Sequence, residues 1–461
     1  MMYRAPFPTS PRIAGLALLL GGGVPVSAQQ WVNPHYDAHR LDFRDLGYPT
    51  QNLIPADDSF VTALLAHSNG LVYGATSGRE HAYLFLYNRY VNKVRPLGRL
   101  PGGNGVHHAL LEAADGSIYI GTGLNVLAPV RPTRDFPVEY EAIVKHLWQD
   151  IKRPYEGYPG GHLLRYDPRT GDARRYTADD ACPVEDLGIP VPANTVYALT
   201  SSPDRRTLYG ISYPDAHFFI FDPAARTTRD LGEFLARRVY GGPERHWRSV
   251  PRALYCDPVT GRLLTSGDNG WFVACDPGTG RIEPTAMRLP GEYWESFKSV
   301  DYPVVENFVR DAAGRVYAGS SDGYLVRLDL ATERTVVLGK PRVQRRLRAL
   351  AAGRDGQLYL VCGETDLISK FYRYDPEPGG GFHDLGVIAV DRSPYYAKRA
   401  YRIDAMAVGA DGTVFLGESD RREKLFLYTP GAEPFPGDMN PTNPVVERMR
   451  PGTPALIPEA L

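Results

Sequence analysis

The sequence predicts an all-β protein, a seven-bladed β-propeller whose blades are four-stranded antiparallel sheets. Three recurring marks support this: apolar first strands, third strands that end near Tyr-Asp-Pro, and fourth strands that end in Leu-Gly. Within each repeat a Gly-containing turn joins two apolar segments, as Asp115-Gly116 does before Ile118-Tyr119-Ile120. Such turns between apolar segments are strong hairpin signals, so each repeat is expected to fold as one meander.

The number of blades comes from two independent series. The first strands begin near Phe60, Val106, Thr195, Val250, Val305, Leu347 and Ile403. The third strands end near Asn88, Pro168, Pro223, Pro277, Asp329, Pro376 and Pro430. Both series give seven, and the repeat continues through the middle of the chain, which argues against two separate domains.

The fourth strands predict how the ring closes. Six of them follow their own repeats, at Leu97, Leu187, Leu231, Leu338 and Leu385 and, in a degenerate form, near Leu289. The seventh, Asp45-Leu46-Gly47, comes before the first repeat, and no fourth strand follows the last repeat at 403–430. The N-terminal segment 40–47 is therefore expected to complete the last blade, which removes exposed sheet edges.

Both ends of the chain are expected to lie outside the propeller. Arg4 and Arg12 precede the apolar run 13–26, and Val26-Ser27-Ala28 has the small residues of a cleavage site. Residues 1–28 therefore read as a signal peptide, which predicts a periplasmic or secreted protein with the propeller at 29–430. The Pro-rich segment 431–461 is expected to be a tail, and no later segment is long and apolar enough to span a membrane.

The composition excludes some partners. The formal net charge is −1, from 52 basic and 53 acidic residues, so nothing indicates nucleic-acid binding. The four cysteines lack metal-ligand spacing, and Cys256 and Cys275 are expected two strands apart, too far for a disulfide. We expect a monomer that requires no cofactor.

The long connections predict which face carries the site. Loops from a fourth strand to the next first strand open on the same face as loops between second and third strands. The long segments all belong to these two kinds: 124–161, an insertion in blade 2, and 233–249, 290–304 and 387–401. Because functional loops cluster on one side of a rigid scaffold, we expect the site on this long-loop face.

Polar residues converge on that face. The first strands place in the central channel Thr62, His108, Tyr197, Arg252, Asn307, Arg348 and Asp404. The starts of the third strands add His162, His217, Trp271 and Tyr324, and Tyr213 ends the second strand of blade 3. Trp247, Trp271, Tyr293 and Trp294 offer flat faces suited to sugar rings. The polar residues also have purely structural interpretations. Arg348 and Asp404 would then be channel residues that only bind water, and Tyr197 and Tyr213 would only pack. His162 and His217 would recur because they occupy equivalent positions in neighbouring repeats.

The set matches what β-elimination of a uronic acid requires: a cation for the carboxylate, a base for the adjacent proton and an acid for the leaving oxygen. Arg252 would hold the carboxylate, with Trp247, Trp271, Asn307, Tyr324 and Arg348 contributing to substrate binding. His108 or Tyr197 would be the base and Tyr197 or Tyr213 the acid, and His162 and His217 would assist. The alternative is that the three histidines hold a metal ion, although their spacing is not diagnostic.

At these residues the chain resembles the β-propeller polysaccharide lyases, chiefly ulvan lyases and more loosely oligogalacturonate lyases. The resemblance implies histidine and tyrosine as base and acid and arginine on the uronate carboxylate. His108 and His162 fit that order once 124–161 is discounted, and Tyr197 resembles the tyrosine of the next inner strand. The arginine expected shortly afterwards is absent, because Tyr213 and His217 stand there, so Arg252 would supply the cation.

The leading hypothesis is therefore an exported polysaccharide lyase that cleaves an acidic, uronate-containing polysaccharide or oligosaccharide. A non-catalytic propeller that binds a glycan or a protein on the same face is the alternative. A metal-dependent hydrolase or lactonase is a third hypothesis.

Overall fold

The structure is a computed structural model of the 461-residue chain. It describes residues 41–46, 53–125, 155–235, 250–291, 303–341, 346–363, 369–392, 396–419 and 424–430. The expected signal peptide at 1–28, the tail at 431–461, most of the 124–161 insertion, and Trp247, Tyr293 and Trp294 lie outside these ranges.

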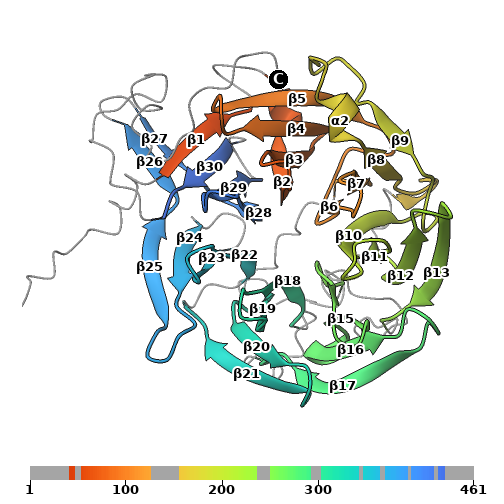
Figure 1. Cartoon of the computed structure of the whole chain (residues 1–461), viewed down its shortest axis with the longest axis vertical. Helices are drawn as coiled ribbons and strands as arrows, with labels where there is room; N and C mark the ends of the chain where they lie inside the picture. Colours follow the sequence, from red (N-terminus) through yellow and green to blue (C-terminus); the bar gives the residue numbers. More distant parts are fainter. Residues whose placement is uncertain are drawn as a thin grey trace, which may run out of the picture.

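Seven four-stranded antiparallel sheets stand around a central axis, as the sequence predicted (Figure 1). In blades 1 to 6 the strands follow chain order from the centre of the ring outward. Blade 1 contains β2 (Phe60–Ala66), β3 (Val72–Ser77), β4 (Ala82–Asn88) and β5 (Lys93–Leu100). Blade 2 contains β6 (Leu110–Glu112), β7 (Ile118–Gly121), β8 (Leu163–Tyr166) and β9 (Val184–Asp186). Blade 3 contains β10 (Thr195–Ser201), β11 (Leu208–Tyr213), β12 (His217–Asp222) and β13 (Thr227–Glu233).

The second half of the ring repeats this arrangement. Blade 4 contains β14 (Tyr255–Cys256), β15 (Leu263–Ser266), β16 (Trp271–Cys275) and β17 (Ile282–Arg288). Blade 5 contains β18 (Val305–Arg310), β19 (Val316–Ser320), β20 (Leu325–Asp329) and β21 (Arg334–Gly339). Blade 6 contains β22 (Leu347–Ala352), β23 (Leu358–Cys362), β24 (Lys370–Tyr374) and β25 (Phe382–Val387).

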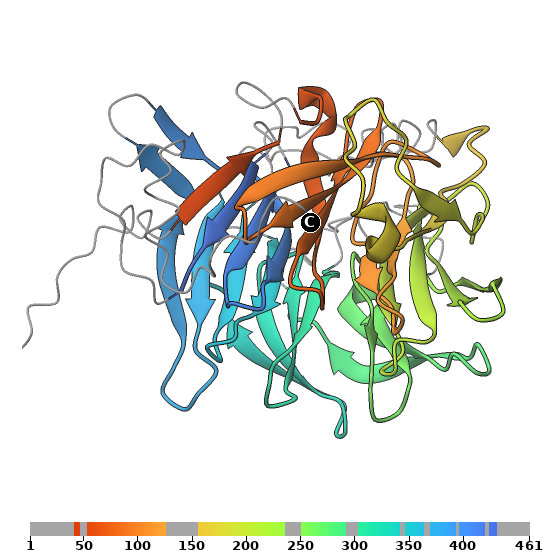
Figure 2. The same cartoon turned by 45° about the horizontal axis from the view of Figure 1, so that its top comes forward.

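Blade 7 joins the two ends of the propeller. It contains β28 (Ile403–Val408), β29 (Val414–Glu418), β30 (Lys424–Tyr428) and, as its outermost strand, β1 (Leu41–Asp45). Leu41 pairs with Tyr428 and Phe43 with Phe426, and the red first strand lies against the blue last strand in both views (Figure 1, Figure 2). The predicted closure by the N-terminal strand is confirmed.

Few elements lie outside the blades in the described ranges. A hairpin of β26 (Ala389–Arg392) and β27 (Tyr396–Arg399) follows blade 6 and precedes blade 7 along the chain. The short helical turns are η2 (Ala56–Asp58), α2 (Pro168–Gly171) and η5 (Asp268–Gly270). None of the described helices is long and apolar enough to cross a membrane.

The Leu-Gly mark has a physical cause in the outer strands. In blades 2 and 3 the preceding aspartate accepts a hydrogen bond from the glycine amide, at 2.9 Å for Asp186 and Gly188 and 2.8 Å for Asp230 and Gly232. Both glycines have positive φ, 94° and 88°, which favours glycine. In blades 1, 3, 5 and 6 the strand register skips the leucine of the mark, so the mark coincides with a bulge in these outer strands.

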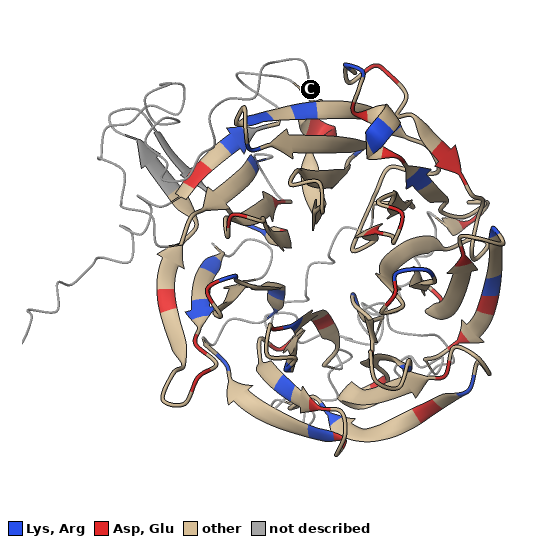
Figure 3. Ribbon diagram, in the orientation of Figure 1, with Lys and Arg blue, Asp and Glu red and all other residues tan. Residues whose placement is uncertain are grey.

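The hydrophobic core lies between neighbouring blades. One cluster joins Leu84 of blade 1 to Ile120 and Leu164 of blade 2, and another joins Phe272 of blade 4 to Val326 of blade 5. All four cysteines are free and buried. Charged positions of both signs are spread around the whole ring (Figure 3).

Candidate functional site

A β-bulge in the innermost strands presents one polar residue per blade at the start of the channel. The strand register skips a residue between Val61 and Ala63, between Val196 and Ala198, and at the corresponding places in blades 5, 6 and 7. The skipped residues are Thr62, Tyr197, Glu306, Arg348 and Asp404. His108 and Arg252 hold the same place before Ala109 and Ala253, which completes a ring of seven residues, here called the polar ring.

The register corrects the prediction in blade 5. Glu306, not Asn307, is the member of the polar ring, because the bulge adds a residue that the sequence pattern did not reveal. Asn307 occupies the next position, where the other six blades carry alanine. It still faces the channel cavity, and its Nδ2 donates a hydrogen bond to the Leu347 carbonyl at 2.7 Å.

Arg252 crosses the channel between opposite blades. One guanidinium nitrogen donates to Glu306 of blade 5 at 2.7 Å, and the other donates to Asp404 of blade 7 at 2.8 Å. Burial opposes the charge of Arg252, but the two carboxylates outweigh it and raise the pKa of this guanidinium. Both terminal nitrogens are thus engaged by carboxylates of the protein, so Arg252 is poorly placed to receive a substrate carboxylate.

Three further arginines share the same two carboxylates. Arg346 contacts Glu306 at 2.7 Å, Arg402 contacts Asp404 at 3.0 Å, and Arg348 donates to Asp404 through Nε at 3.0 Å and through Nη2. The motif Arg-x-Arg at 346–348 and Arg-x-Asp at 402–404 places both added arginines two residues before the polar ring. The sequence shows this spacing. The predicted channel residues began at Arg348 and Asp404, however, and so left out Arg346 and Arg402, which lie two residues earlier.

These six residues form a buried cluster with a positive excess, here called the arginine cluster: Arg252, Arg346, Arg348, Arg402, Glu306 and Asp404. Burial works against ionised carboxylates, but the surrounding guanidinium groups hold the pKa of Glu306 and of Asp404 below their usual ranges. Four guanidinium groups therefore face two carboxylates. Burial and the charges of Arg346 and Arg252, partly offset by Asp404, lower the pKa of Arg348 to about 9, so it remains charged at pH 7.

Within the arginine cluster, Arg348 has an unsatisfied donor. Its side chain is 1% exposed, and its Nη1 is buried without a hydrogen-bond partner among the described residues. A buried charged donor without a partner is costly, because its interaction with water is lost and not replaced. A negative group placed against Nη1 would remove this cost.

His108 lines the channel cavity beside the arginine cluster. Burial and the charge of Arg252 hold the pKa of His108 well below its usual range, so the imidazole is neutral at pH 7. Its neighbour His107 turns away and donates from Nε2 to the Leu124 carbonyl at 3.0 Å. Burial lowers the pKa of His107 to about 4.

Tyr197 packs next to His108, with ring centroids 6.4 Å apart and planes nearly perpendicular. Burial raises the pKa of its phenol, which therefore keeps its proton at neutral pH. Tyr213 packs behind it, with ring centroids 5.2 Å apart and planes tilted by 38°, and is buried against Tyr155 from the end of the insertion. His108 and Tyr197 are thus adjacent, but of the two His108 lines the channel cavity, whereas Tyr197 belongs with Tyr213 to the aromatic layer behind it.

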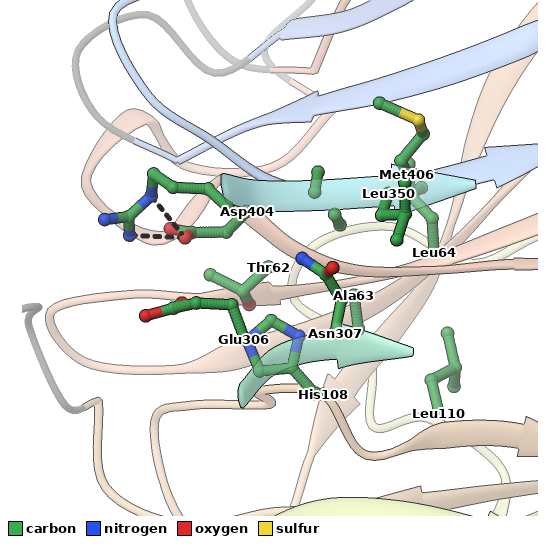
Figure 4. A pocket seen from close by; sticks show the side chains of 13 residues that line it. Thr62, Ala63, Leu64, His108, Leu110, Glu306, Asn307, Leu350, Asp404 and Met406 are labelled. Carbon is green, nitrogen blue, oxygen red and sulfur yellow. Dashed lines mark hydrogen bonds and ion pairs between the residues drawn. The ribbon is translucent and has the colours of Figure 1, made fainter. Parts of the chain in front are cut away.

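A cavity of about 160 Å³ extends from the polar ring along the channel (Figure 4). Its charged end contains His108, Glu306, Asn307, Arg348 and Asp404, together with Thr62. Two residues farther along the same strands, the wall becomes apolar, with Leu64, Leu110, Leu350 and Met406. The cavity therefore runs from the polar ring toward the ends of the first strands, away from the long-loop face.

His162 and His217 do not point into this cavity. His162 Nδ1 lies 2.8 Å from Asp186 on β9, and His217 Nδ1 lies 2.9 Å from Asp230 on β13. Both partners are on the outermost strands, so each histidine faces away from the channel. The two pairs occupy equivalent places in blades 2 and 3.

The aromatic residues of blades 4 and 5 lie apart from the cavity as well. Trp271 is 42% exposed, with the Arg288 guanidinium 5.3 Å from its ring. Tyr324 is half-buried, and the Lys340 ammonium lies 5.5 Å from the centroid of its ring. Each is thus an aromatic–cation pair at the start of a third strand.

In the described part of the chain, no three His, Cys, Asp or Glu side chains are grouped to hold a metal ion. No family model and no curated protein matches the chain.

Several solved propellers resemble it in fold. A streptogramin B lyase is 12% identical with a TM-score of 0.53, over 84% of this chain and 97% of that chain. Virginiamycin B lyase from Staphylococcus aureus is 12% identical with a TM-score of 0.51, over 84% and 99%. The extracellular domain of the one-component system BT4673 from B. thetaiotaomicron is 13% identical with a TM-score of 0.50, over 83% of this chain and 39% of that chain. At such identities the likeness concerns the fold.

Proposed function

We propose that this chain is an exported, monomeric propeller that binds a carboxylate-bearing saccharide at its polar ring and cleaves it by β-elimination. The observation that carries the proposal is the buried positive excess of the arginine cluster, with the unsatisfied Nη1 of Arg348 beside a neutral His108. A carboxylate is the group that a guanidinium recognises best. The substrate class is a uronate-containing glycan.

In this mechanism Arg348 replaces Arg252 as the cation on the carboxylate, because Arg252 is held by Glu306 and Asp404. Neutralising the carboxylate acidifies the adjacent C5–H bond of the uronate. His108 takes that proton, a C4–C5 double bond forms, the C4–O bond breaks, and Tyr197 protonates the departing oxygen. The lowered pKa of His108 leaves it free to accept a proton, and the raised pKa of Tyr197 leaves it a proton to give.

The fold is compatible with such chemistry. Two of the similar solved propellers are lyases, one of streptogramin B and one of virginiamycin B. Their substrates are their own, and the analogy supports only that a ring of this topology can host an elimination site.

The test is incubation with a panel of uronate polysaccharides and oligosaccharides while ultraviolet absorbance is followed. The new double bond is conjugated with the carboxylate, so absorbance should rise with at least one substrate. His108→Ala and Tyr197→Phe should each lower the rate roughly 100-fold or more. Arg281→Met, at a largely exposed arginine of blade 4, is the matched control and should leave the rate unchanged. No absorbance change with any uronate, from protein shown to be folded, would refute the lyase.

A second candidate, binding without turnover, is favoured by the pairing of Arg252 with Glu306 and Asp404 across the channel. An ionic network already satisfied in this way rigidifies a binding site more than it assists a reaction. It predicts saturable calorimetric binding of uronates without product, and an affinity that Tyr197→Phe barely changes.

A further inference from the structure

We infer that the channel cavity takes one ring-sized hydroxy acid, either a free uronic acid or the terminal ring of a chain, and not the interior of a polymer. The inference rests on the carboxylate recognition proposed above. It adds the size of the bound unit, the residue that contacts its hydroxyl group and the mode of attack, which would be at the reducing end, because only there does a terminal uronate carry the C4–O bond that the elimination breaks.

The volume matches one ring. The cavity measures about 160 Å³. An engineered protein cavity of about 150 Å³ holds a single benzene molecule, so the space here accommodates one six-membered ring, whose substituents extend toward the open side of the cavity. A second saccharide unit would lie beyond the residues that line this cavity.

The two ends of the cavity match the two kinds of surface on such a ring. His108 and Asp404, to which Arg348 is hydrogen-bonded, lie at one end, and Leu64, Leu350 and Met406 lie at the other (Figure 4). The carboxylate of a uronic acid projects from one edge of the ring, and its C–H bonds form apolar surface elsewhere. A ring with its carboxylate on Arg348 would therefore place apolar surface on apolar side chains.

Two unsatisfied atoms in the lining define the polar contacts. Nη1 of Arg348 is a donor without a partner among the described residues, and Oδ1 of Asn307 is a buried acceptor without one. The donor suits a carboxylate oxygen, and the acceptor suits a hydroxyl group. A hydroxy acid supplies both, whereas a simple carboxylate supplies only the first.

The polar ring also opposes threading of a chain. Arg252 and Asp404 come from opposite blades and meet at 2.8 Å, and Arg252 meets Glu306 at 2.7 Å. A polymer could pass along the channel only by breaking these buried ion pairs. The unit that reaches Arg348 must therefore be an end.

Asn307 provides a clean test because alanine stands at its place in the other six blades. Asn307→Ala should consequently fold normally. We would measure calorimetric affinities for glucuronate, galacturonate, glucose and cyclohexanecarboxylate, with uronate oligosaccharides whose two ends are blocked as the polymer probe.

The expected result is one-to-one binding of at least one uronic acid and weaker or no binding of glucose. Asn307→Ala should weaken uronic-acid binding roughly 10-fold and leave cyclohexanecarboxylate unchanged. Arg348→Met should abolish binding of both acids, while Arg281→Met should change neither. Should Arg348→Met fail to fold, Asn307→Ala alone decides the hydroxyl contact.

Three outcomes overturn the inference. End-blocked oligosaccharides that bind as tightly as the free acid would show that chain interiors are recognised, while leaving the proposed function intact. Equal effects of Asn307→Ala on uronic acid and cyclohexanecarboxylate would remove the hydroxyl contact. Failure of every carboxylate to bind would remove the proposed function itself.

Discussion

Removing the charge of Asp404 should strongly destabilise the propeller. Its carboxylate accepts hydrogen bonds from Arg252 at 2.8 Å and from Arg348, contacts Arg402 at 3.0 Å, and also accepts the Ser419 hydroxyl. Asp404→Asn preserves the size of the side chain and removes the negative charge. Four guanidinium groups would then face the single carboxylate of Glu306.

The magnitude follows from burial. Asp404 is 5% exposed and Arg348 2%, so solvent screens their interaction weakly. Breaking a buried ion pair by removing one partner typically costs about 3–5 kcal/mol, because the remaining charge stays buried without compensation. Three arginines lose a partner here, which favours the upper part of that range. Domains are commonly stable by only about 5–15 kcal/mol, so the loss would be large.

Urea unfolding of wild type and Asp404→Asn at pH 7, followed by circular dichroism, measures the change. The double variant Asp404→Asn/Arg348→Met restores the original balance of charge and should recover part of the loss. A decrease of less than about 1 kcal/mol for the single variant would refute the reasoning. So would a double variant less stable than the sum of the two single changes.

Three further predictions concern other parts of the fold. The pKa of His107 is lowered to about 4, below the value of about 6.5 expected when unfolded, so the free energy of unfolding should fall by up to about 3 kcal/mol as pH decreases through this window. His107→Gln should flatten that pH profile in urea titrations, and parallel profiles would contradict it. Phe43→Ala in β1, where the ring is 4% exposed, should cost about 3–5 kcal/mol in urea unfolding, whereas Val337→Ala at an exposed site should cost under about 0.5 kcal/mol; equal losses would argue against β1 as part of the core. Gly171→Ala would place a Cβ 2.4 Å from the Tyr166 ring and should cost about 1–3 kcal/mol by the same measurement; an unchanged midpoint would show that the ring moves freely.

The blade count and the closure were predictable because the marks that signalled them have local causes. The aspartate-to-glycine hydrogen bond of the outer strands, as in Asp230 and Gly232, needs specific residues at fixed spacing. Among the blades whose register skips the leucine, blades 3 and 6 carry this aspartate, whereas Leu-Gly alone marks blades 1 and 5. The shifted position of Asp45-Leu46-Gly47 then predicted the pairing of β1 with β30.

The site was only partly predictable because its geometry depends on contacts between distant strands. The inner bulge moved the polar-ring position of blade 5 from Asn307 to Glu306. His162 turns toward Asp186 on the outer strand, a pairing that no local pattern announces. The mutual pairing of Arg252 and Asp404 across 152 residues likewise depends on the closed ring. The sequence analysis selected polar residues at the starts of the first strands, but it could not identify their partners.

The closure by β1 has a consequence for how the chain is made. Leu41 pairs with Tyr428, so the strand that emerges first from the ribosome waits for the one that emerges last. At about 5–20 residues per second, β1 remains unpaired for roughly 20–80 seconds of synthesis. During that time the growing array has an open edge, and the entropic cost of joining its ends is met only in the final step. A chain stopped before β30 would expose two unpaired edges at once, one on β1 and one on β29, and should be recognised by proteases and chaperones as unfinished.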